Sequence, residues 1–388
     1  MAANCSSIEG MGLGKGVMHV SVTSVADVMQ AQPDEGMTVF WRADQPIGHV
    51  LVHEGQVTDA RIEHIDDEFL SAVQSRMRTP TKVELSASVV ICTRDRPDEL
   101  GKCLSSLPRQ SHPPREIIVI DNASRDQRTR EVALAAGAVY VREERAGLDI
   151  ARNAGALCAT GDIVAYTDDD VVLHPRWLEQ LMCAFDSPQI GAVTGLVLPA
   201  ELATEAQRHF ETYWGFGKGY REQDYDSLRF ESHRGQVLPA WDIGAGASMA
   251  FRREVFQAIG FFDERLDVGQ AGCSGDSEYW YRLLARGYTC RYTPASVAFH
   301  FHRRTMDGLA SQIYHYMRGH AAALLVQYER TGIAANRSLA YFYKPRWYLH
   351  RLLRKLMERG SIRDRFFKEE ITGYFAGLLF YHRRRLRR

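Results

Sequence analysis

Three consecutive carboxylates follow a short apolar run in AYTDDDVVLHPRW, residues 165–177. At the end of a buried strand, Asp168, Asp169 and Asp170 repel one another and raise one another's pKa. One aspartate would suffice to cap the helix predicted after them, so three indicate a further purpose. A hard divalent cation, which prefers carboxylate oxygens, would offset their charge. We therefore expect a metal or a substrate to bind here.

These acids lie where predicted strands and helices alternate. Short apolar, β-branched runs predict strands at 86–93, 116–122, 138–143 and 161–170, with helices between them. This alternation predicts an α/β fold with a mostly parallel sheet flanked by helices. Ligands bind such sheets at the carboxyl ends of the strands. The polar stretches CTRDR, DNAS and TDDD all fall at those ends, which indicates one shared site.

The two ends of the chain have a different character. Residues 1–82 predict a small β-rich module with a loose first 30 residues, a hairpin over 37–56 and a helix over 65–77. Residues 306–388 predict a helical, basic region. From 344 onward it holds 14 Lys and Arg against 4 Asp and Glu.

Composition excludes several classes of protein. The 388 residues carry a formal net charge of zero, so no overall field favours nucleic acid as a partner. Seven scattered cysteines without a CxxC spacing favour a reducing compartment and give no sign of a zinc site. No secretory pattern opens the chain, and its longest apolar run, 371–381, is far shorter than the roughly 20 residues of a transmembrane helix. We expect a cytoplasmic protein.

Seven stretches between residues 86 and 305 resemble, in order, the inverting glycosyltransferases of family 2. They are SVVICTRDRP, IIVIDNASRD, GLDIARNAGA, AYTDDDVVLHPRWL, GAGASMAFRREVFQAIGFFDERL, SGDSEYWYRLLARGY and SVAFHFHRR. The resemblance implies the GT-A fold, a Rossmann-like sheet, for a catalytic domain at 83–305. Its nucleotide-binding half would span 86–175 and its acceptor half 190–305.

The resemblance implies a role for each acid of the triplet. The family's DxD motif falls on Asp168 and Asp170, so Asp170 would bind Mg²⁺ or Mn²⁺, and Asp168 would contact the metal or the ribose. Asp169 is either spare or a second contact to the nucleotide sugar. A histidine after the last strand can complete the metal's coordination in this family. His300 is preferred over His302, which faces the same way two residues on.

Four further residues resemble the family's nucleotide-binding positions. Thr93, Arg96 and Asp121 match those that hold the base, and a carboxylate at Asp121 would favour uracil. The alternative for Asp121 is a turn-forming residue. Arg152 matches the arginine that contacts the nucleotide, and its alternative is a solvated charge on a helix face.

The acceptor hydroxyl needs a general base, because its own pKa lies far above 7. The resemblance places Asp276 at that position, with Glu278 as the competing candidate and a helix cap as the structural alternative. Gly275 replaces the family's usual Glu, and Ser248 stands where Asn is commoner.

Aromatic side chains near the proposed base suggest acceptor contacts. Trp241, Tyr279 and Trp280 could stack on sugar rings, although aromatic residues belong more often to the core.

The sequence thus predicts a metal-dependent transfer of one sugar, of hexosyl type, from a nucleotide-diphosphate sugar, with UDP favoured. The acceptor would be a hydroxyl on a glycan, a lipid-linked molecule or a protein, in glycan or cell-envelope polysaccharide synthesis. The basic C-terminal region could contact the inner membrane face or form a solvated bundle. The rival interpretations are a non-catalytic nucleotide-binding protein and a sugar-nucleotide nucleotidyltransferase. The second would have a glycine-rich phosphate loop after the first strand, whereas CTRDRP at that place contains no glycine.

Overall fold

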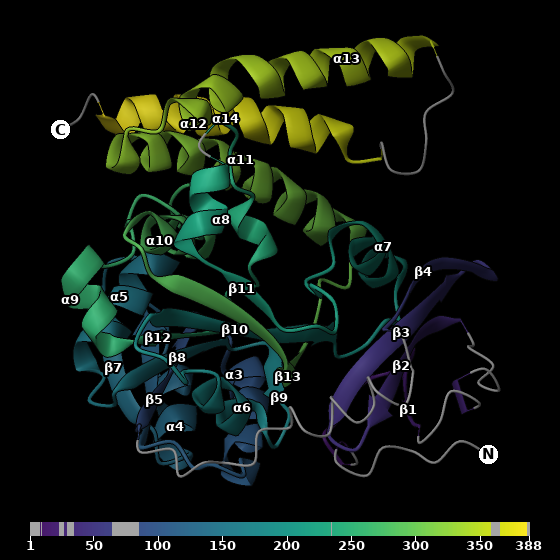
Figure 1. Cartoon of the computed structure of the whole chain (residues 1–388). Helices are drawn as coiled ribbons and strands as arrows, with labels where there is room; N and C mark the ends of the chain where they lie inside the picture. The colour runs from purple at the N-terminus through teal and green to yellow at the C-terminus, as the bar shows by residue number, and fades with distance from the viewer. Residues whose placement is uncertain are drawn as a thin grey trace.

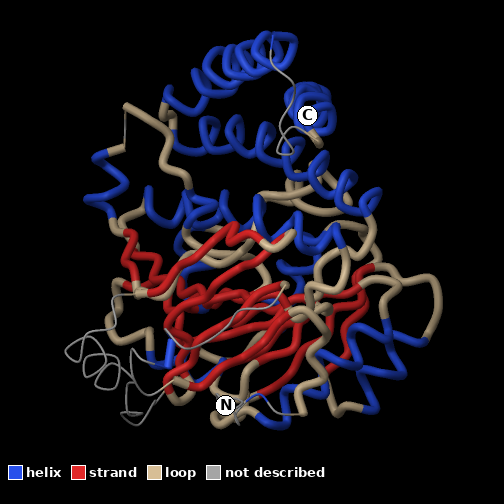
Figure 2. Tube along the Cα trace, turned by 90° about the vertical axis from the view of Figure 1, so that its right-hand side faces the viewer, coloured by secondary structure: helices blue, strands red, loops and turns tan. Residues whose placement is uncertain are grey.

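The computed structural model describes residues 8, 10–22, 27–28, 35–63, 85–233, 235–357 and 365–385. Within these ranges the chain forms a nine-stranded sheet and a four-stranded N-terminal sheet. Figure 1 shows the small sheet beside the large one, and the long helices of the C-terminal region stacked above the large domain. Figure 2, turned by 90°, shows the strands gathered centrally with helices above and below them.

The strands have the following bounds. They are β1 (Val17–Ser21), β2 (Gly36–Arg42), β3 (Gln45–His53), β4 (Gln56–Ile62), β5 (Ala87–Thr93), β6 (Glu116–Asn122), β7 (Val139–Glu143), β8 (Ile163–Asp168), β9 (Val171–Leu173), β10 (Ile190–Pro199), β11 (Gln223–Tyr225), β12 (Ser248–Arg252) and β13 (Thr289–His300).

The helices of the large domain cover both faces of its sheet, and the later ones form the C-terminal region. They are α3 (Pro97–Ser106), α4 (Arg128–Ala135), α5 (Leu148–Cys158), α6 (Trp177–Cys183), α7 (Glu205–Trp214), α8 (Ser227–Ser232), α9 (Arg253–Ile259), α10 (Gly275–Ala285), α11 (Met306–Thr331), α12 (Ala334–Ser338), α13 (Lys344–Met357) and α14 (Phe367–Arg385). Short 3₁₀ turns lie at Leu107–Arg109 and Ala240–Asp242, and a π-helical turn lies at Leu339–Tyr343.

The order of the large sheet is β11-β13-β10-β12-β8-β5-β6-β7, with β9 paired to β13. As predicted, β7, β6, β5 and β8 are parallel neighbours, whereas β12 runs antiparallel between β8 and β10. In this register Thr93 lies beside Asp121 and Cys92 beside Asp168. The polar residues at three strand ends therefore meet at one edge.

Alternating side chains of β5 build two hydrophobic layers. Val90 packs in the layer that includes α5, whereas Val89 and Ile91 pack in the layer that includes α3, because successive strand residues face opposite ways. All three are fully buried. This packing fixes the end of β5, and with it Thr93, against the ends of β6 and β8.

The N-terminal module shares the core of the large domain. Trp41 on β2 is fully buried, and its ring stacks on His174 with ring centroids 5.5 Å apart. The expectation of a loose first 30 residues is wrong for Val17–Ser21, because β1 pairs in parallel with β2 and buries Val20. The predicted hairpin is present as β2 and β3, whereas the predicted helix over 65–77 lies outside the described residues.

Across the described ranges, none of the helices combines the length and the apolar content that crossing a bilayer requires.

Candidate active site

The acid triplet is held by the end of β5. Asp168 ends β8, and Asp169 and Asp170 form the turn to β9. Asp169 accepts hydrogen bonds from the Thr93 hydroxyl at 2.7 Å and from Arg96 Nη1 at 2.6 Å. Arg96 Nη2 donates to Asp170 Oδ2 at 2.8 Å. Thr93 and Arg96 thus contact the acids, and Asp169 is engaged with both of them.

A histidine from β13 completes a cluster with the two outer acids. His300 Nε2 lies 3.3 Å from Asp170 Oδ1. Ligand atoms of Asp168, Asp170 and His300 all lie within 4.8 Å of one another. His302 is directed elsewhere, since its Nε2 lies 3.0 Å from Glu211 Oε2 and its Nδ1 lies 2.9 Å from His300 Nδ1. Two carboxylate oxygens and one imidazole nitrogen at this spacing fit Mg²⁺ or Mn²⁺.

The electrostatics of the triplet favour a cation. Burial raises the pKa of Asp168 to about 6 and that of Asp169 to about 7, and the charge of Asp170 adds to both shifts. Burial also acts to raise the pKa of Asp170, but His300 and Arg96 hold it well below its usual range. Three buried carboxylates share one guanidinium and one imidazole, so a divalent cation would offset the remaining charge.

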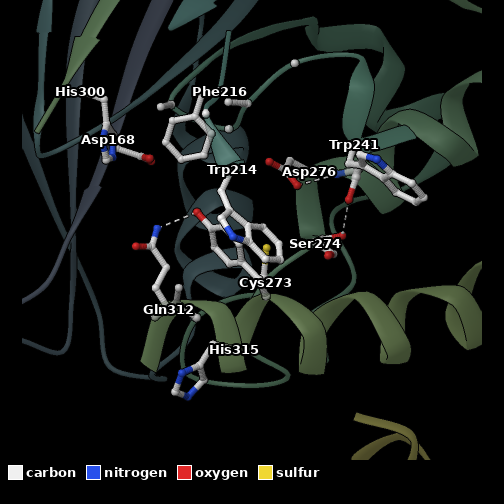
Figure 3. A pocket seen from close by; sticks show the side chains of 18 of the residues that line it. Asp168, Trp214, Phe216, Trp241, Cys273, Ser274, Asp276, His300, Gln312 and His315 are labelled. Atoms are coloured by element: carbon white, nitrogen blue, oxygen red, sulfur yellow. Dashed lines mark hydrogen bonds between the residues drawn. The ribbon is translucent and has the colours of Figure 1, made fainter. Parts of the chain in front are cut away.

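Asp276 lies in the same cavity, at the second residue of α10. Its Oδ1 accepts a hydrogen bond from the Ser277 backbone N–H at 2.6 Å, and Asp276 lines the cavity. It is not the helix cap of the structural alternative, because Ser274 occupies the N-cap position. In Figure 3, Asp168 and His300 lie on one side of the pocket and Asp276 on the other. Burial raises the pKa of Asp276, Asp267 raises it further, and Arg152 opposes the shift. A raised pKa suits a group that must take up a proton.

Arg152 is a buried ion-pair partner and not a solvated charge on a helix face. Its Nη1 lies 2.6 Å from Asp267 Oδ2 and 3.0 Å from Asp149 Oδ1. Arg152 also lines the cavity. It therefore brings positive charge to the wall that holds Asp276.

Asp121 departs from the expected contact with a base. Its Oδ1 accepts a hydrogen bond from the Ser124 N–H at 2.9 Å, and its Oδ2 accepts from the Tyr140 hydroxyl at 2.7 Å and from Arg142 Nη1 at 3.0 Å. The geometry matches the turn-forming alternative. Asn122, and not Asp121, belongs to the cavity wall.

The acceptor candidates divide into two groups. Trp241 and Trp280 line the cavity, although Trp280 is fully buried and Trp241 is 44% exposed. Glu278 does not fit the expectation of an acceptor contact, because its buried carboxylate forms an ion pair with Arg282 at 3.0 Å, away from the cavity wall. Tyr279 packs in the core against Phe262, with ring centroids 4.5 Å apart.

The cavity has a volume of about 1280 Å³, and three parts of the chain form its walls. The stretch 211–220 lines one of these walls. The sequence did not predict the contributions of the N-terminal sheet and of the C-terminal helices, which carry no motif. These missed residues include His49, Asp59, Arg61, His315, Tyr316, Lys344, Trp347 and Arg351.

Comparison with known proteins matches the middle of the chain to one family. Residues 88–260 match the family model described as glycosyl transferase family 2. Over 192 residues, covering 46% of the chain, it is 27% identical to a glucosyl-dolichyl phosphate glucuronosyltransferase of Haloferax volcanii. Over 224 residues, covering 55% of the chain, it is 28% identical to the O-antigen biosynthesis protein RfbC of Myxococcus xanthus. The matches span 56% and 17% of these two relatives, respectively.

Two solved structures are similar to the chain at low sequence identity. A mannosyltransferase of Pyrobaculum calidifontis, in complex with GDP-Man and Mn²⁺, is 19% identical, with a TM-score of 0.49 over 82% of this chain and 94% of that one. A glucosyl-3-phosphoglycerate synthase of Mycobacterium tuberculosis, in complex with Mn²⁺, UDP and phosphoglyceric acid, is also 19% identical. Its TM-score is 0.43 over 63% of this chain and 79% of that one.

Proposed function

Because residues 88–260 match glycosyl transferase family 2, we propose that they form a catalytic domain with the GT-A fold. This domain transfers one sugar from a nucleotide-diphosphate sugar to an acceptor hydroxyl, with inversion. The donor in this proposal is the UDP-linked hexose that the resemblance implies, although Asp121, the residue that favoured uracil, does not line the cavity. The acceptor belongs to glycan or cell-envelope polysaccharide synthesis, which agrees with the names of the relatives that act on glucosyl-dolichyl phosphate and in O-antigen biosynthesis.

One observation carries the proposal. A cluster of two carboxylates and an imidazole lies in the wall of the same cavity as a half-buried carboxylate of raised pKa, Asp276. Asp168, Asp170 and His300 would hold Mg²⁺ or Mn²⁺, and the bound ion would supply positive charge to the departing diphosphate. A cation-binding group and a separate proton acceptor are the two parts that this transfer requires.

The residues of the chain divide the reaction between them. Asp276 accepts the proton of the acceptor hydroxyl while that oxygen attacks the anomeric carbon. The bond to the diphosphate breaks on the opposite face, so the configuration inverts. Thr93 and Arg96 hold Asp169 and Asp170 in place. Because Asp169 and Asp170 are buried, their fixed charges act more strongly than they would in solution.

A donor screen tests the proposal. We would measure the melting temperature of the protein with Mn²⁺ and each of UDP-, GDP-, ADP- and dTDP-sugars, and then assay release of the nucleoside diphosphate. We expect UDP-sugars to raise the melting temperature as mass action requires, and to be turned over. Stabilisation by another nucleotide would overturn the UDP assignment, and binding without turnover for every donor would indicate a non-catalytic nucleotide-binding protein.

A matched pair of variants tests the general base. Asp276→Asn should abolish transfer, by about 10²-fold or more, and retain stabilisation by UDP and Mn²⁺. Asp98→Asn, at an exposed position on α3, is the control and should transfer at the rate of the unmodified protein. Unchanged turnover in Asp276→Asn would exclude Asp276 as the base.

A further inference from the structure

Helix α13 and the turn before it expose a row of apolar side chains. Phe342 is 70% exposed, Leu349 56%, Leu352 41% and Leu353 48%. Phe342, Leu349 and Leu353 follow the spacing i, i+7, i+11, which places them along one line of a helix. We call these four residues the α13 apolar stripe. Exposed apolar residues that gather on one helix face mark an interaction surface more often than scattered ones do.

Positive charge borders the stripe. Between Lys344 and Met357 the sequence has five Lys and Arg, one His and no Asp or Glu. Arg346, His350, Arg354 and Lys355 are exposed, and we call them the basic flank. An amphipathic helix with this combination is suited to the interface of an anionic bilayer.

The position of α13 leaves this face uncovered. Figures 1 and 2 show α13 as the outermost helix, on the far side of α11 from the large sheet. Its inward side carries Lys344, Tyr348 and Arg351, which are buried or half-buried. The apolar stripe therefore does not belong to the core that the helix builds with the rest of the molecule.

The inward side of α13 also borders the active-site cavity. Lys344, Trp347 and Arg351 line that cavity together with α11. Trp347 is 44% exposed as well, so it reaches both the cavity and the outer surface. Lys344 Nζ lies 4.6 Å and Arg351 Cζ 4.8 Å from the centroid of its ring. The cavity thus reaches α13 on the side away from the stripe, because residues two apart on a helix, such as Trp347 and Leu349, point in nearly opposite directions. At this end of the cavity Arg351 is paired with Glu370 at 2.6 Å.

Charge decides between the partners that could cover this face. A second copy of the chain would bring a second basic flank against the first, and like charges would oppose the contact. An anionic lipid surface complements the flank and accepts the apolar stripe at the same time. Since the described helices do not span a bilayer, the contact would be interfacial.

We propose that α13 docks on the surface of an anionic lipid bilayer, with the apolar stripe at the boundary of headgroups and acyl chains and the basic flank against lipid phosphates. The docking does not rest on the proposed function.

Vesicle co-sedimentation of the full chain tests the docking. The vesicles would be phosphatidylcholine alone, or phosphatidylcholine with one third phosphatidylglycerol, at low salt and at 0.5 M NaCl. We expect binding to the anionic vesicles that weakens at high salt, and little binding to neutral ones. Leu349→Glu/Leu353→Glu should reduce the bound fraction at least tenfold. Arg346→Glu/Arg354→Glu should reduce it by on the order of fivefold per residue.

Two control pairs make the test specific. Leu157→Glu/Leu228→Glu changes two leucines that are 70% and 77% exposed on α5 and α8. Arg125→Glu/Arg253→Glu makes the same charge change at exposed sites elsewhere. Both pairs should bind vesicles as the unmodified protein does, and thermal melts would establish that all four variants fold.

Three results would overturn the docking: equal loss of binding in the control pairs, no binding to anionic vesicles, or a dimer in light scattering that only the Leu349→Glu/Leu353→Glu pair dissociates. Because sedimentation requires no turnover, its failure would leave the proposed transfer intact. Failure of the donor screen would likewise leave the docking result intact.

Discussion

The carboxylate of Asp149 occupies the space that a side chain at residue 275 would need. A Cβ built on Gly275 would lie 2.0 Å from Asp149 Oδ2, and that oxygen has no hydrogen-bond partner among the described residues. Asp149 is fully buried, and its other oxygen pairs with Arg152. Gly275, where the resemblance leads us to expect Glu, is therefore coupled to an acid that reaches the same place from α5.

This coupling predicts a non-additive pair of variants. Gly275→Ala should destabilise the protein by about 1–3 kcal/mol, because the added methyl group overpacks a buried site. In an Asp149→Ala background the same change should cost less than about 0.5 kcal/mol, since the clashing oxygen is gone. Urea denaturation of the four proteins measures the cycle.

Gly101 supplies the control for that cycle. It lies on α3, and a Cβ there would meet its nearest atom at 3.8 Å. Gly101→Ala should be neutral or stabilising, because Ala is the better helix former. Equal costs of Gly275→Ala in both backgrounds would show that Asp149 and residue 275 are independent.

Asp276 should make the protein less stable at neutral pH than an uncharged residue would. Its folded pKa is raised above the unfolded value, so its contribution to stability is complete below the unfolded pKa, about 3.9, and is lost as the pH rises through the folded pKa. Asp276→Asn should therefore raise the melting temperature at pH 7 and leave it little changed at pH 3.5. A melting temperature that falls at pH 7 would contradict this account.

Replacing Arg96 should make the thermal stability of the protein depend more strongly on bound metal. Arg96 bonds to both Asp169 and Asp170, so Arg96→Gln leaves their charges opposed only by His300 and any bound cation. We expect a lower melting temperature in EDTA and a larger rise on adding Mn²⁺ than in the unmodified protein. Arg94→Gln is the control, because Arg94 lies close to Arg96 in the sequence and its own side chain is 47% exposed. Equal Mn²⁺ increments in the two variants would argue against the role of Arg96.

Acid should weaken the contact between the N-terminal sheet and the large domain. Burial lowers the pKa of His19 to about 4; the same cause lowers that of His174 to about 4. Each residue's contribution is present above its unfolded pKa, near 6.5, and is lost as the pH falls towards 4. From pH 7 to pH 5 the free energy of unfolding of the unmodified protein should fall by about 2 kcal/mol more than that of His174→Asn does. Parallel curves of unfolding free energy against pH would exclude His174 as a cause.

The sequence was informative where chemistry is concentrated in short stretches. The resemblance implied Asp168, Asp170 and His300 as metal ligands, and their ligand atoms do lie close together. The parallel strands around β5 were predicted within two residues at their ends, and in β5, β6 and β8 the apolar runs that mark them are mostly buried on both faces.

Long-range packing was the part that local patterns could not reveal. The residues of β4 are exposed along nearly the whole strand, so no alternation of apolar and polar residues marks it. The contact of Asp149 with Gly275 joins two separate helices, and the role of Arg152 as their ion-pair neighbour follows only from that contact. The hydrogen bonds of Asp121 likewise depend on Tyr140 and Arg142 of the next strand.

Three parts of the chain enclose the cavity. We therefore expect that the residues that select the acceptor can change without changing the residues proposed to catalyse the transfer. Asp168, His300 and Asp276 come from β8, β13 and α10, whereas His49 and Asp59 come from the N-terminal sheet, and Trp347 comes from α13. A relative could acquire a new acceptor by exchanging its first 63 residues or its last helices and keep the same catalytic residues. Chimeras cut at those points would be a direct route to new glycosidic products.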